Sequence, residues 1–301
     1  MSAGSDNARW FLPSGSAADG GWSLVIDERT EGWEHTGLRT ATLAAGESLE
    51  LALGAREAVV VPLGGDVVVA VVDGEGGRHE AALAGRESVF AGPADVALAG
   101  RGSRLIVTGS GSGSRVAVCL AADPGDLPPA PFRHLPAAQI PVELRGAGIA
   151  SRQVRNFGIP GVLEANRMIA CEVITPAGNW SSWPPHKHDV ERDGLETELE
   201  EIYYFETRST DERGTDPVGY QRVYGTDERP IDVLAEVRSG DVVLVPHGWH
   251  GPAVAAPNAD LYYLNVMAGP GPERAWLICD DPVHGWVRET WSDQEIDPRL
   301  R

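Results

Sequence analysis

Residues 58–72 read AVVVPLGGDVVVAVV, two runs of mainly β-branched residues separated by two glycines. β-Branched side chains pack well on a pleated sheet, and short runs of them bounded by glycine, serine or aspartate are typical of strands. Similar runs occupy residues 104–107 and 115–120, and 36 glycines and 22 prolines divide the chain into short pieces. Many short strands without long helical periods predict an all-β sandwich or barrel.

The chain is long enough for two domains, at 301 residues. Residues 123–131, DPGDLPPAP, interrupt the strand pattern in the way that an interdomain connector does. Residues 87–93 align without a gap with 241–247, which favours a duplicated β domain. We therefore predict one domain over 1–140 and a second over 141–301. Strands of the second domain are predicted at residues 168–175, 202–205, 221–224, 241–245 and 261–267.

The charge of the chain excludes several classes of partner. Lysine and arginine number 25 against 44 acidic residues, and the formal charge of −19 repels nucleic acid and anionic membrane surfaces. A small anion remains a possible substrate, because a few arginines in a pocket outweigh the distant surface field. Residues 1–7 lack the features of a signal peptide and no run is long enough to span a membrane, so we expect a cytoplasmic protein. Cys119, Cys171 and Cys279 form no Cys-x-x-Cys pair and are expected to be free thiols.

Two histidines separated by one residue lie in residues 182–189, SWPPHKHD. Side chains two residues apart project from the same side of a strand, so His186 and His188 can reach one metal ion. His250, in the run VPHGWHG over 245–251, offers a third imidazole. A lone histidine is usually a surface or capping residue, but the His-x-His spacing favours a metal site. His247 is a weaker candidate, because a turn residue can be only a loop or substrate contact.

A carboxylate at the start of an aromatic strand offers an oxygen ligand. Glu200 and Glu201 compete for this role, and strand alternation sends neighbours to opposite faces. We choose Glu201 because Tyr203 and Phe205 then share its inward face. Three imidazoles and one carboxylate leave an open position, which is typical of a catalytic site. In the internal alignment Val96 stands opposite His250, so the metal is expected in the second domain.

Lys187 is the only lysine of the chain and lies between the two histidines. If His186 and His188 point inward, strand alternation points Lys187 outward, unless a bulge turns it. We expect its ammonium to meet the acidic loop over residues 189–200, another strand or a neighbouring subunit.

The motif His186-x-His188, Glu201 and His250 resembles the cupin superfamily. More specifically, residues 176–189, PAGNWSSWPPHKHD, and 199–204, LEEIYY, resemble the 5-deoxy-glucuronate isomerases of myo-inositol catabolism. Further similar runs that support the same resemblance are GYQRVY over 219–224 and YYLNVMAG over 262–269. That family is similar to the uronate ketol-isomerases of pectin breakdown. Trp183 and Phe205 depart from its commonest pattern, where tyrosine and histidine are expected.

The resemblance implies an all-β bicupin, with two jelly-roll-like β-barrel domains and the metal in the C-terminal one. The implied metal ligands are His186, His188, Glu201 and His250, and the implied cofactor is one divalent ion, Zn or Mn in preference to Fe, Co or Ni. The first domain is then a cupin-like domain without metal ligands. Similar cupins associate through their sheets, so a homo-oligomer is expected.

The implied reaction is the isomerisation of 5-deoxy-D-glucuronate to 5-dehydro-2-deoxy-D-gluconate through a metal-stabilised enediolate. The base is expected to be Glu172 or a water on the metal. An arginine should meet the carboxylate of this small sugar acid, with Arg222 preferred and Arg155 second. The remaining candidates for substrate contacts in the pocket are Tyr203, Tyr263 and Asn265. Each of these arginines can instead form a surface salt bridge, and each of the three pocket candidates can be core packing or a strand-end amide.

Two alternatives differ in class from the isomerase. A metal-dependent dioxygenase of the same fold would need Fe(II) and would consume oxygen, whereas an isomerase leaves the oxygen concentration unchanged. A sugar-binding bicupin without catalytic activity seldom requires an open metal position, so a complete set of three histidines and a glutamate argues against it.

Overall fold

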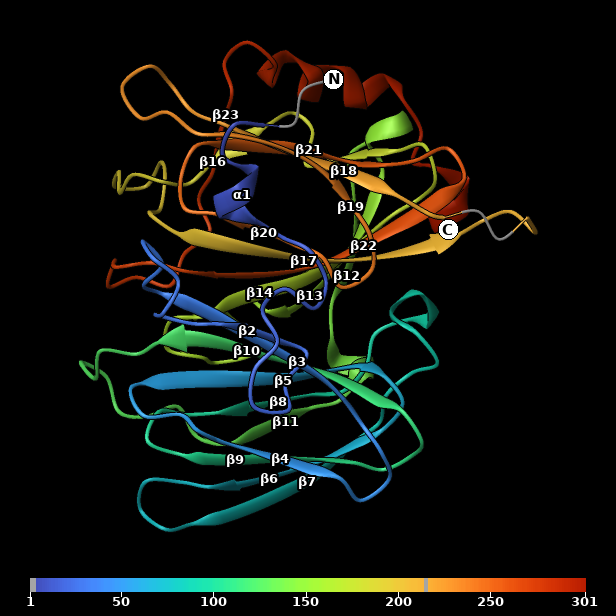
Figure 1. Ribbon diagram of the computed structural model, residues 1–301. Coiled ribbons are helices and arrows are strands. Elements are labelled where there is room, and N and C mark those ends of the chain that lie inside the picture. The colour runs from blue at the N-terminus through green and yellow to red at the C-terminus, as the bar shows by residue number, and fades with distance from the viewer. Residues whose placement is uncertain (1–3, 214–215) are drawn as a thin grey trace.

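The computed structural model describes residues 4–213 and 216–301, in which four antiparallel β-sheets are stacked as layers (Figure 1). We call them the N-outer, N-inner, C-inner and C-outer sheets. The N-outer sheet has the order β4 (Ser48–Ala52), β9 (Arg104–Gly109), β6 (Val67–Val72) and β7 (Arg78–Leu83). The N-inner sheet has the order β11 (Arg133–Leu135), β8 (Val96–Ala99), β5 (Arg56–Gly64), β10 (Ser114–Ala122), β3 (Thr36–Leu43) and β2 (Leu24–Ile26).

The other two sheets hold mainly the second half of the chain. The C-inner sheet has the order β1 (Phe11–Leu12), β20 (Val242–Val245), β17 (Glu200–Ser209), β22 (Ala259–Ala268), β14 (Ile169–Thr175), β13 (Arg152–Gly158) and β12 (Val142–Arg145). The C-outer sheet has the order β19 (Asp232–Val237), β18 (Gly219–Tyr224), β21 (Trp249–Ala255), β16 (His186–Lys187) and β23 (Cys279–Asp280), and β15 (Trp180–Ser181) also pairs with β21.

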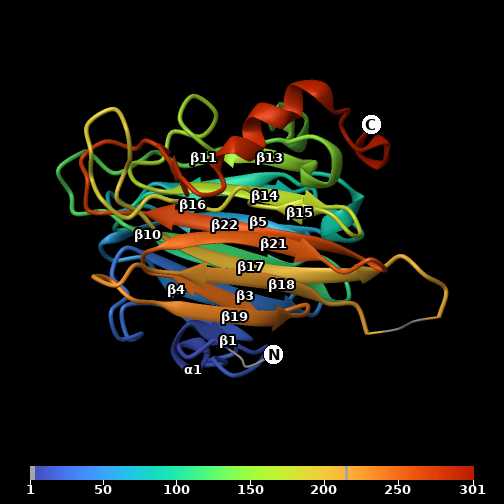
Figure 2. The ribbon, with the colours of Figure 1, turned by 90° about the horizontal axis from the view of Figure 1, so that it is seen from above.

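Helices are short. They are α1 (Asn7–Trp10) and the 3₁₀ helices η1 (Val89–Ala91), η2 (Ala137–Gln139), η3 (Gly148–Ala150), η4 (Gly285–Asp293) and η5 (Pro298–Leu300). Seen from above, α1 lies at one edge of the stack beside β19, and η4 lies at the opposite edge beside β13 (Figure 2). No helix in residues 4–213 or 216–301 is long and apolar enough to span a membrane.

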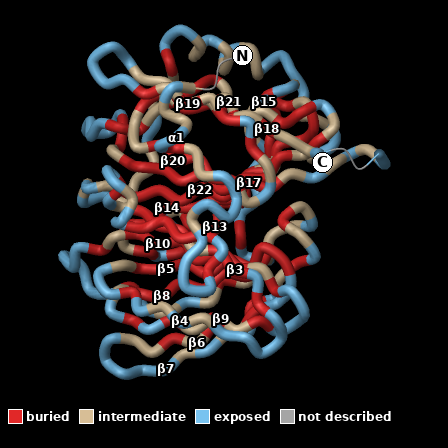
Figure 3. Tube along the Cα trace, in the orientation of Figure 1, coloured by how far each residue is buried: buried red, intermediate tan, exposed pale blue. Residues whose placement is uncertain are grey.

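Burial explains why the inner strands lack the usual alternation of apolar and polar residues. In β5, Val59 and Val61 enter the core between the two inner sheets, while Ala58 and Val60 enter the core between the N-inner and N-outer sheets. Because both faces are buried, the strand is a continuous apolar run. The edges of the stack are more exposed than its centre (Figure 3). The all-β prediction is confirmed, and the layers are open, jelly-roll-like sandwiches rather than closed barrels.

The change from one pair of sheets to the other falls between β11 and β12, close to residue 140. The N-terminal segment does not follow this division, because β1 pairs with β20, with Phe11 opposite Val243. The Asn7 side chain also bonds the backbone of β19 through the Leu234 carbonyl, at 2.7 Å. This segment covers an edge strand of the C-inner sheet. The division into 1–140 and 141–301 stays a prediction.

The two halves are joined by buried carboxylates as well as by apolar packing. Glu57, on β5, is fully buried and accepts hydrogen bonds at 2.7 Å from the backbone N–H groups of Asn166, Arg167 and Met168. We expect Glu57→Ala to lower the free energy of unfolding by about 2 kcal/mol, because buried N–H donors would lose their acceptors. Urea denaturation measures this, with the half-exposed Glu50→Ala as control. Equal losses in the two variants would contradict the prediction.

The three cysteines are free in the structure, as expected. Cys119 and Cys171 are buried within the inner sheets, and Cys279 is partly exposed. Burial raises the pKa of the Cys171 thiol to about 12, so it stays protonated at neutral pH.

Candidate active site

A cavity of about 480 Å³ lies between the C-inner and C-outer sheets, at the edge of the stack where η4 lies. The size is within the usual range for a small-molecule site. Its lining combines three arginines with tryptophan, tyrosine, histidine and glutamate side chains. The lining residues are Glu143, Leu144, Arg145, Gly146, Arg152, Val154, Val173, Ser182, His186, Glu201, Tyr203, Tyr263, Asn265, Trp276, Ile278, Arg288 and Trp291.

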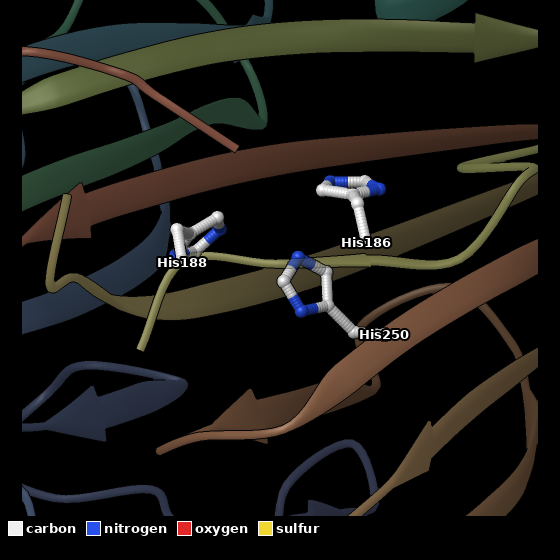
Figure 4. Close-up of side chains that lie close together, drawn as sticks. All are labelled: His186, His188 and His250. Carbon is white, nitrogen blue, oxygen red and sulfur yellow. The ribbon is translucent and has the colours of Figure 1, made fainter. Parts of the chain in front are cut away.

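Three buried histidines converge beside this cavity (Figure 4). His186 lies on β16 and is the register partner of His250 on β21, and His188 follows β16. One ring nitrogen of each histidine lies within 4.8 Å of those of the other two. The ring centroids of His186 and His188 are 4.5 Å and 4.7 Å from that of His250. The predicted His-x-His pair therefore faces the third imidazole.

Backbone carbonyls orient two of the rings. His188 donates from Nδ1 to the Leu199 carbonyl at 3.1 Å, and His250 donates from Nδ1 to the Gly248 carbonyl at 3.1 Å. In this tautomer the Nε2 atom of each ring carries a lone pair. Both Nε2 atoms lie 3.1 Å from Oε2 of Glu201, and Nε2 of His250, although buried, has no aligned hydrogen-bond partner. This donor set fits a divalent ion, which accepts imidazole nitrogens together with a carboxylate oxygen.

The surroundings also suit metal ligation electrostatically. Burial lowers the pKa of His186 well below its ordinary value, and the two neighbouring imidazoles add to this, so His186 is neutral. Burial disfavours the ionised form of Glu201, but the neighbouring His188 and His250 imidazoles outweigh it and lower the pKa of the carboxyl. A neutral imidazole and an ionised carboxylate are the forms that bind a metal.

The structure separates the two competing glutamates. Glu201 faces the histidines, whereas Glu200 points to the opposite side of β17, as strand alternation requires. The Glu200 carboxylate accepts hydrogen bonds from the backbone N–H groups of Glu34 at 3.1 Å and His35 at 2.7 Å. It therefore ties a loop of the first half of the chain to the strand that carries Glu201.

Lys187 points away from the cavity, as the alternation argument predicts. Its ammonium donates to Asp189 at 2.5 Å and to Glu196 at 2.7 Å, both in the acidic loop, and lies 5.5 Å from the centroid of the Trp249 ring. The prediction that Lys187 meets the acidic loop is confirmed.

Tyr203, Tyr263 and Asn265 line the cavity. The Tyr263 ring lies 5.1 Å from that of Tyr203, and its hydroxyl is hydrogen-bonded to Ser181 and lies 3.3 Å from the Ser182 hydroxyl. His247 is not among the lining residues, and its ring lies 3.3 Å from the Pro230 carbonyl. Of the predicted substrate contacts, these three are thus brought together with the histidines.

Three other predicted residues lie elsewhere. Glu172 and Arg155 face the opposite side of the C-inner sheet from the cavity, where Glu172 is hydrogen-bonded to Arg86 and Tyr262, and Arg155 donates to the Val89 carbonyl at 2.7 Å. Alternation explains both corrections, because Cys171 and Val173 flank Glu172 and Val154 precedes Arg155.

Arg222 is the third correction. It lies on the outer side of β18, where it is hydrogen-bonded to Asp232 and donates to the Val233 carbonyl at 2.8 Å. The residues on either side of it, Gln221 and Val223, are the buried ones. The prediction that Arg222 faces the substrate is therefore wrong, because its side chain projects from the outer face of β18.

The arginines that do line the cavity are Arg145, Arg152 and Arg288. Arg152 and Arg155 lie on the same strand. Alternation of side chains along β13 turns Arg152 toward the cavity and Arg155 toward the opposite face of the sheet. Arg288 lies in η4, whose sequence carries no strand or ligand pattern. The sequence held no decisive signal for Arg152, because Val154 marks its face of β13 while Phe157 marks that of Arg155, and it held none for Arg288.

Two jelly-roll-like sandwiches, the second with a histidine cluster beside a cavity, define an all-β protein of the bicupin type. The chain belongs to the KduI/IolB family, whose model matches residues 10–287. A 5-deoxy-glucuronate isomerase of Geobacillus kaustophilus is 37% identical over 285 residues, which cover 94% of this chain and 96% of that protein. A 5-deoxy-glucuronate isomerase of Bacillus velezensis is 35% identical over 85% of this chain and 89% of its own length.

Solved structures agree with this fold. A crystal structure of an IolB-like protein from Salmonella typhimurium LT2 superposes with a TM-score of 0.80 at 34% identity, covering 92% of this chain and 98% of that one. An oxalate decarboxylase of Lactobacillus farciminis superposes with a TM-score of 0.63 at 12% identity, over 90% of this chain and 88% of its own. The second likeness concerns the fold alone.

Proposed function

We propose that this chain is a 5-deoxy-glucuronate isomerase, which converts 5-deoxy-D-glucuronate to 5-dehydro-2-deoxy-D-gluconate. The observation that carries the proposal is the identity of 37% to a relative of that name over nearly the whole of both chains. The cavity adds support, because it combines a cluster of metal-binding residue types with arginines suited to a sugar acid.

We infer that His186, His188, Glu201 and His250 hold one divalent ion, with Zn or Mn the best match to imidazole and carboxylate ligands. A bound ion of this kind supplies a Lewis acid that polarises the carbonyl and hydroxyl oxygens of a substrate. The neutral state of His186 and the ionised state of Glu201 support this assignment.

The tyrosines of the cavity suit contacts to substrate hydroxyls. Burial raises the pKa of both Tyr203 and Tyr263 above the ordinary value, so each keeps its proton and can donate a hydrogen bond. Ser182 lies 3.4 Å from the Tyr203 hydroxyl and 3.3 Å from that of Tyr263, which helps to hold both phenols in place. Proton transfer between the two reacting carbons then needs a base other than Glu172, and a water molecule in the cavity is the remaining candidate.

The proposal is tested with purified protein and 5-deoxy-D-glucuronate, with the product followed by proton NMR and dissolved oxygen by an electrode. We expect the substrate and product to reach equilibrium at constant oxygen concentration. The activity should be lost after chelation and should return when Zn or Mn is added. Oxygen uptake that accompanies turnover would indicate a dioxygenase. Binding of the sugar acid without conversion at any metal loading would indicate a sugar-binding protein.

Two further expectations accompany this function. A cytoplasmic location and a homo-oligomeric state remain predictions, which fractionation of cells and analytical ultracentrifugation test directly.

A further inference from the structure

Arg152 differs from the other buried arginines in lacking a carboxylate partner. Four arginines of residues 4–213 and 216–301 are buried. Arg86 and Arg155 lie beside Glu172, and Arg167 lies beside Asp126. Arg152, which is 8% exposed, has no carboxylate within 4.0 Å in these ranges, and its guanidinium donates to the Ala150 carbonyl at 3.1 Å.

An unpaired guanidinium in such a position is costly to the fold. Burial lowers the pKa of Arg152 to about 10, which reflects poor solvation of its charge. Buried charges in proteins are normally paired, and removal of one partner leaves the other strongly unfavourable. The side chain nevertheless lines the cavity, so an anion that enters the cavity can supply the missing partner.

Arg288 and the indole ring of Trp291 lie close to Arg152. The Trp291 ring lies close to both Arg152 and Arg288, whose guanidinium carbons are 5.7 Å and 5.1 Å from the ring centroid. Arg288 is fixed by two hydrogen bonds to Asp280, at 2.5 Å and 2.7 Å. Nε1 of Trp291 is buried and has no hydrogen-bond partner in the described part of the chain. Stacking on an indole orients a guanidinium and leaves its N–H edge free to donate.

The acidic residues of the cavity are already paired. Glu143 forms an ion pair with Arg145 at 2.9 Å and accepts from Asn156 at 3.2 Å, and Glu201 lies beside His188 and His250. Because Arg288 is paired with Asp280 and Arg145 with Glu143, the unbalanced positive charge near Trp291 is that of Arg152. Arg288 and Trp291 also lie beyond residues 10–287, which the family model matches.

We propose that Arg152, together with Arg288 and the indole N–H of Trp291, binds the carboxylate of the substrate and selects sugar acids over neutral sugars. A planar guanidinium matches a carboxylate through two parallel hydrogen bonds. A sugar acid held there presents its other end to the cavity wall that carries His186 and Glu201. This role rests on the proposed function for the identity of the substrate, but the carboxylate site can be tested without turnover.

The test uses two probes that have no aldehyde or ketone group and cannot be isomerised. One is the acid obtained by borohydride reduction of 5-deoxy-D-glucuronate, and the other is the neutral alditol obtained by reduction of 5-deoxy-D-glucose. Calorimetric titration of the metal-loaded wild-type protein should give a Kd for the acid on the order of 100-fold lower than for the neutral alditol, since hydrogen bonds to a charged group are strong. Arg152→Met should reduce this ratio to a few-fold and leave the Kd of the neutral alditol unchanged.

Two variants complete the design. Arg155→Met removes an equally buried arginine three residues along the same strand, and should keep the preference for the acid even if it lowers the melting temperature. Arg152→Lys keeps the charge but cannot form two parallel bonds, so its preference should be intermediate. If Arg152→Met does not fold, Arg152→Lys still tests the proposal, because its Kd for the acid should rise while its Kd for the neutral alditol stays unchanged.

The outcomes separate this site from the proposed function. A wild-type protein without preference for the acid, or an Arg152 variant that keeps it, overturns the carboxylate site whether or not the protein is an isomerase. A protein that shows the Arg152-dependent preference but does not convert 5-deoxy-D-glucuronate keeps the site and loses the proposed function.

Discussion

Replacement of His188 by alanine is expected to reduce turnover of 5-deoxy-D-glucuronate by at least about 1000-fold, because a Lewis acid contributes several kcal/mol to stabilisation of the transition state. His188 is buried and its Nε2 lies 3.1 Å from the Glu201 carboxylate, so the replacement removes one ligand from the buried metal site that we propose. Atomic absorption of the dialysed variant should show loss of the divalent ion in parallel with the activity.

His79→Ala is the matched control. His79 also pairs with a carboxylate, Asp73 at 3.1 Å, but it lies on β7 of the N-outer sheet. The N-inner sheet lies between that sheet and the sandwich that holds the cavity (Figure 1). Its replacement should leave metal content and turnover at the level of the wild-type protein. Full activity in the His188 variant would show that the ligand assignment is wrong.

Replacement of Arg86 by methionine is expected to lower the free energy of unfolding by about 3–5 kcal/mol, because it leaves the charge of Glu172 buried without its main partner. The side chains of Arg86 and Glu172 are 3% and 2% exposed, and Tyr262 donates to the same carboxylate at 2.8 Å. Arg86 belongs to the first half of the chain and Glu172 to β14, so this pair joins the halves. Denaturation in guanidinium chloride measures the loss.

Two comparisons make this result specific to burial. Arg104→Met breaks the ion pair with Glu50, in which both side chains are 52% exposed, and should cost less than about 1 kcal/mol. The double variant Arg86→Met with Glu172→Gln should recover part of the lost stability, since the uncompensated charge of Glu172 is removed and only Arg155 loses a carboxylate neighbour, at 3.8 Å. If the single Arg86 variant is as stable as Arg104→Met, the pair does not stabilise the interface.

The same pair predicts a dependence on pH. Burial raises the pKa of Glu172, but Arg86 outweighs it and holds the pKa below the ordinary value. Its contribution to stability is therefore present above the pKa of an unfolded glutamate and is lost as the pH falls through the lower, folded value. The difference in stability between wild type and Arg86→Met should shrink as the pH is lowered in this range.

The strand content could be predicted because the inner strands are buried on both faces. Residues 58–63 fall in such a strand, β5, whereas residues 67–72 form β6 of the N-outer sheet, in which burial alternates. Both runs are rich in β-branched residues, which favour strands. The pairing of β1 with β20 could not be predicted, because a strand of two residues carries no periodic pattern. The packing of the two inner sheets on each other is likewise a property of three-dimensional contacts rather than of spacing.

In the site, predictions succeeded where the strand phase was marked and failed where it was not. Tyr203 and Phe205 set the phase of β17, and Glu201 was placed correctly beside the histidines. In β13 and β18 the phase is not marked, so the sequence favours Arg155 and Arg222, whereas Arg152 is the arginine of β13 that lines the cavity. The prediction that Glu172 faces the cavity is wrong for a related reason. Both faces of β14 are buried, so the sequence does not distinguish a carboxylate that faces the cavity from one that faces the N-inner sheet.

The most direct test of the central claim follows one carbon of the substrate. 5-Deoxy-D-glucuronate labelled with ¹³C at C1 is incubated with the metal-loaded protein in deuterated water and observed by carbon NMR. We predict that the labelled aldehyde carbon becomes a hydroxymethyl carbon with solvent deuterium attached, as a proton-transfer isomerisation requires. A hydroxymethyl carbon without deuterium would contradict the enediolate route, and a labelled carbon that stays an aldehyde or becomes a carboxylate would contradict the proposed function.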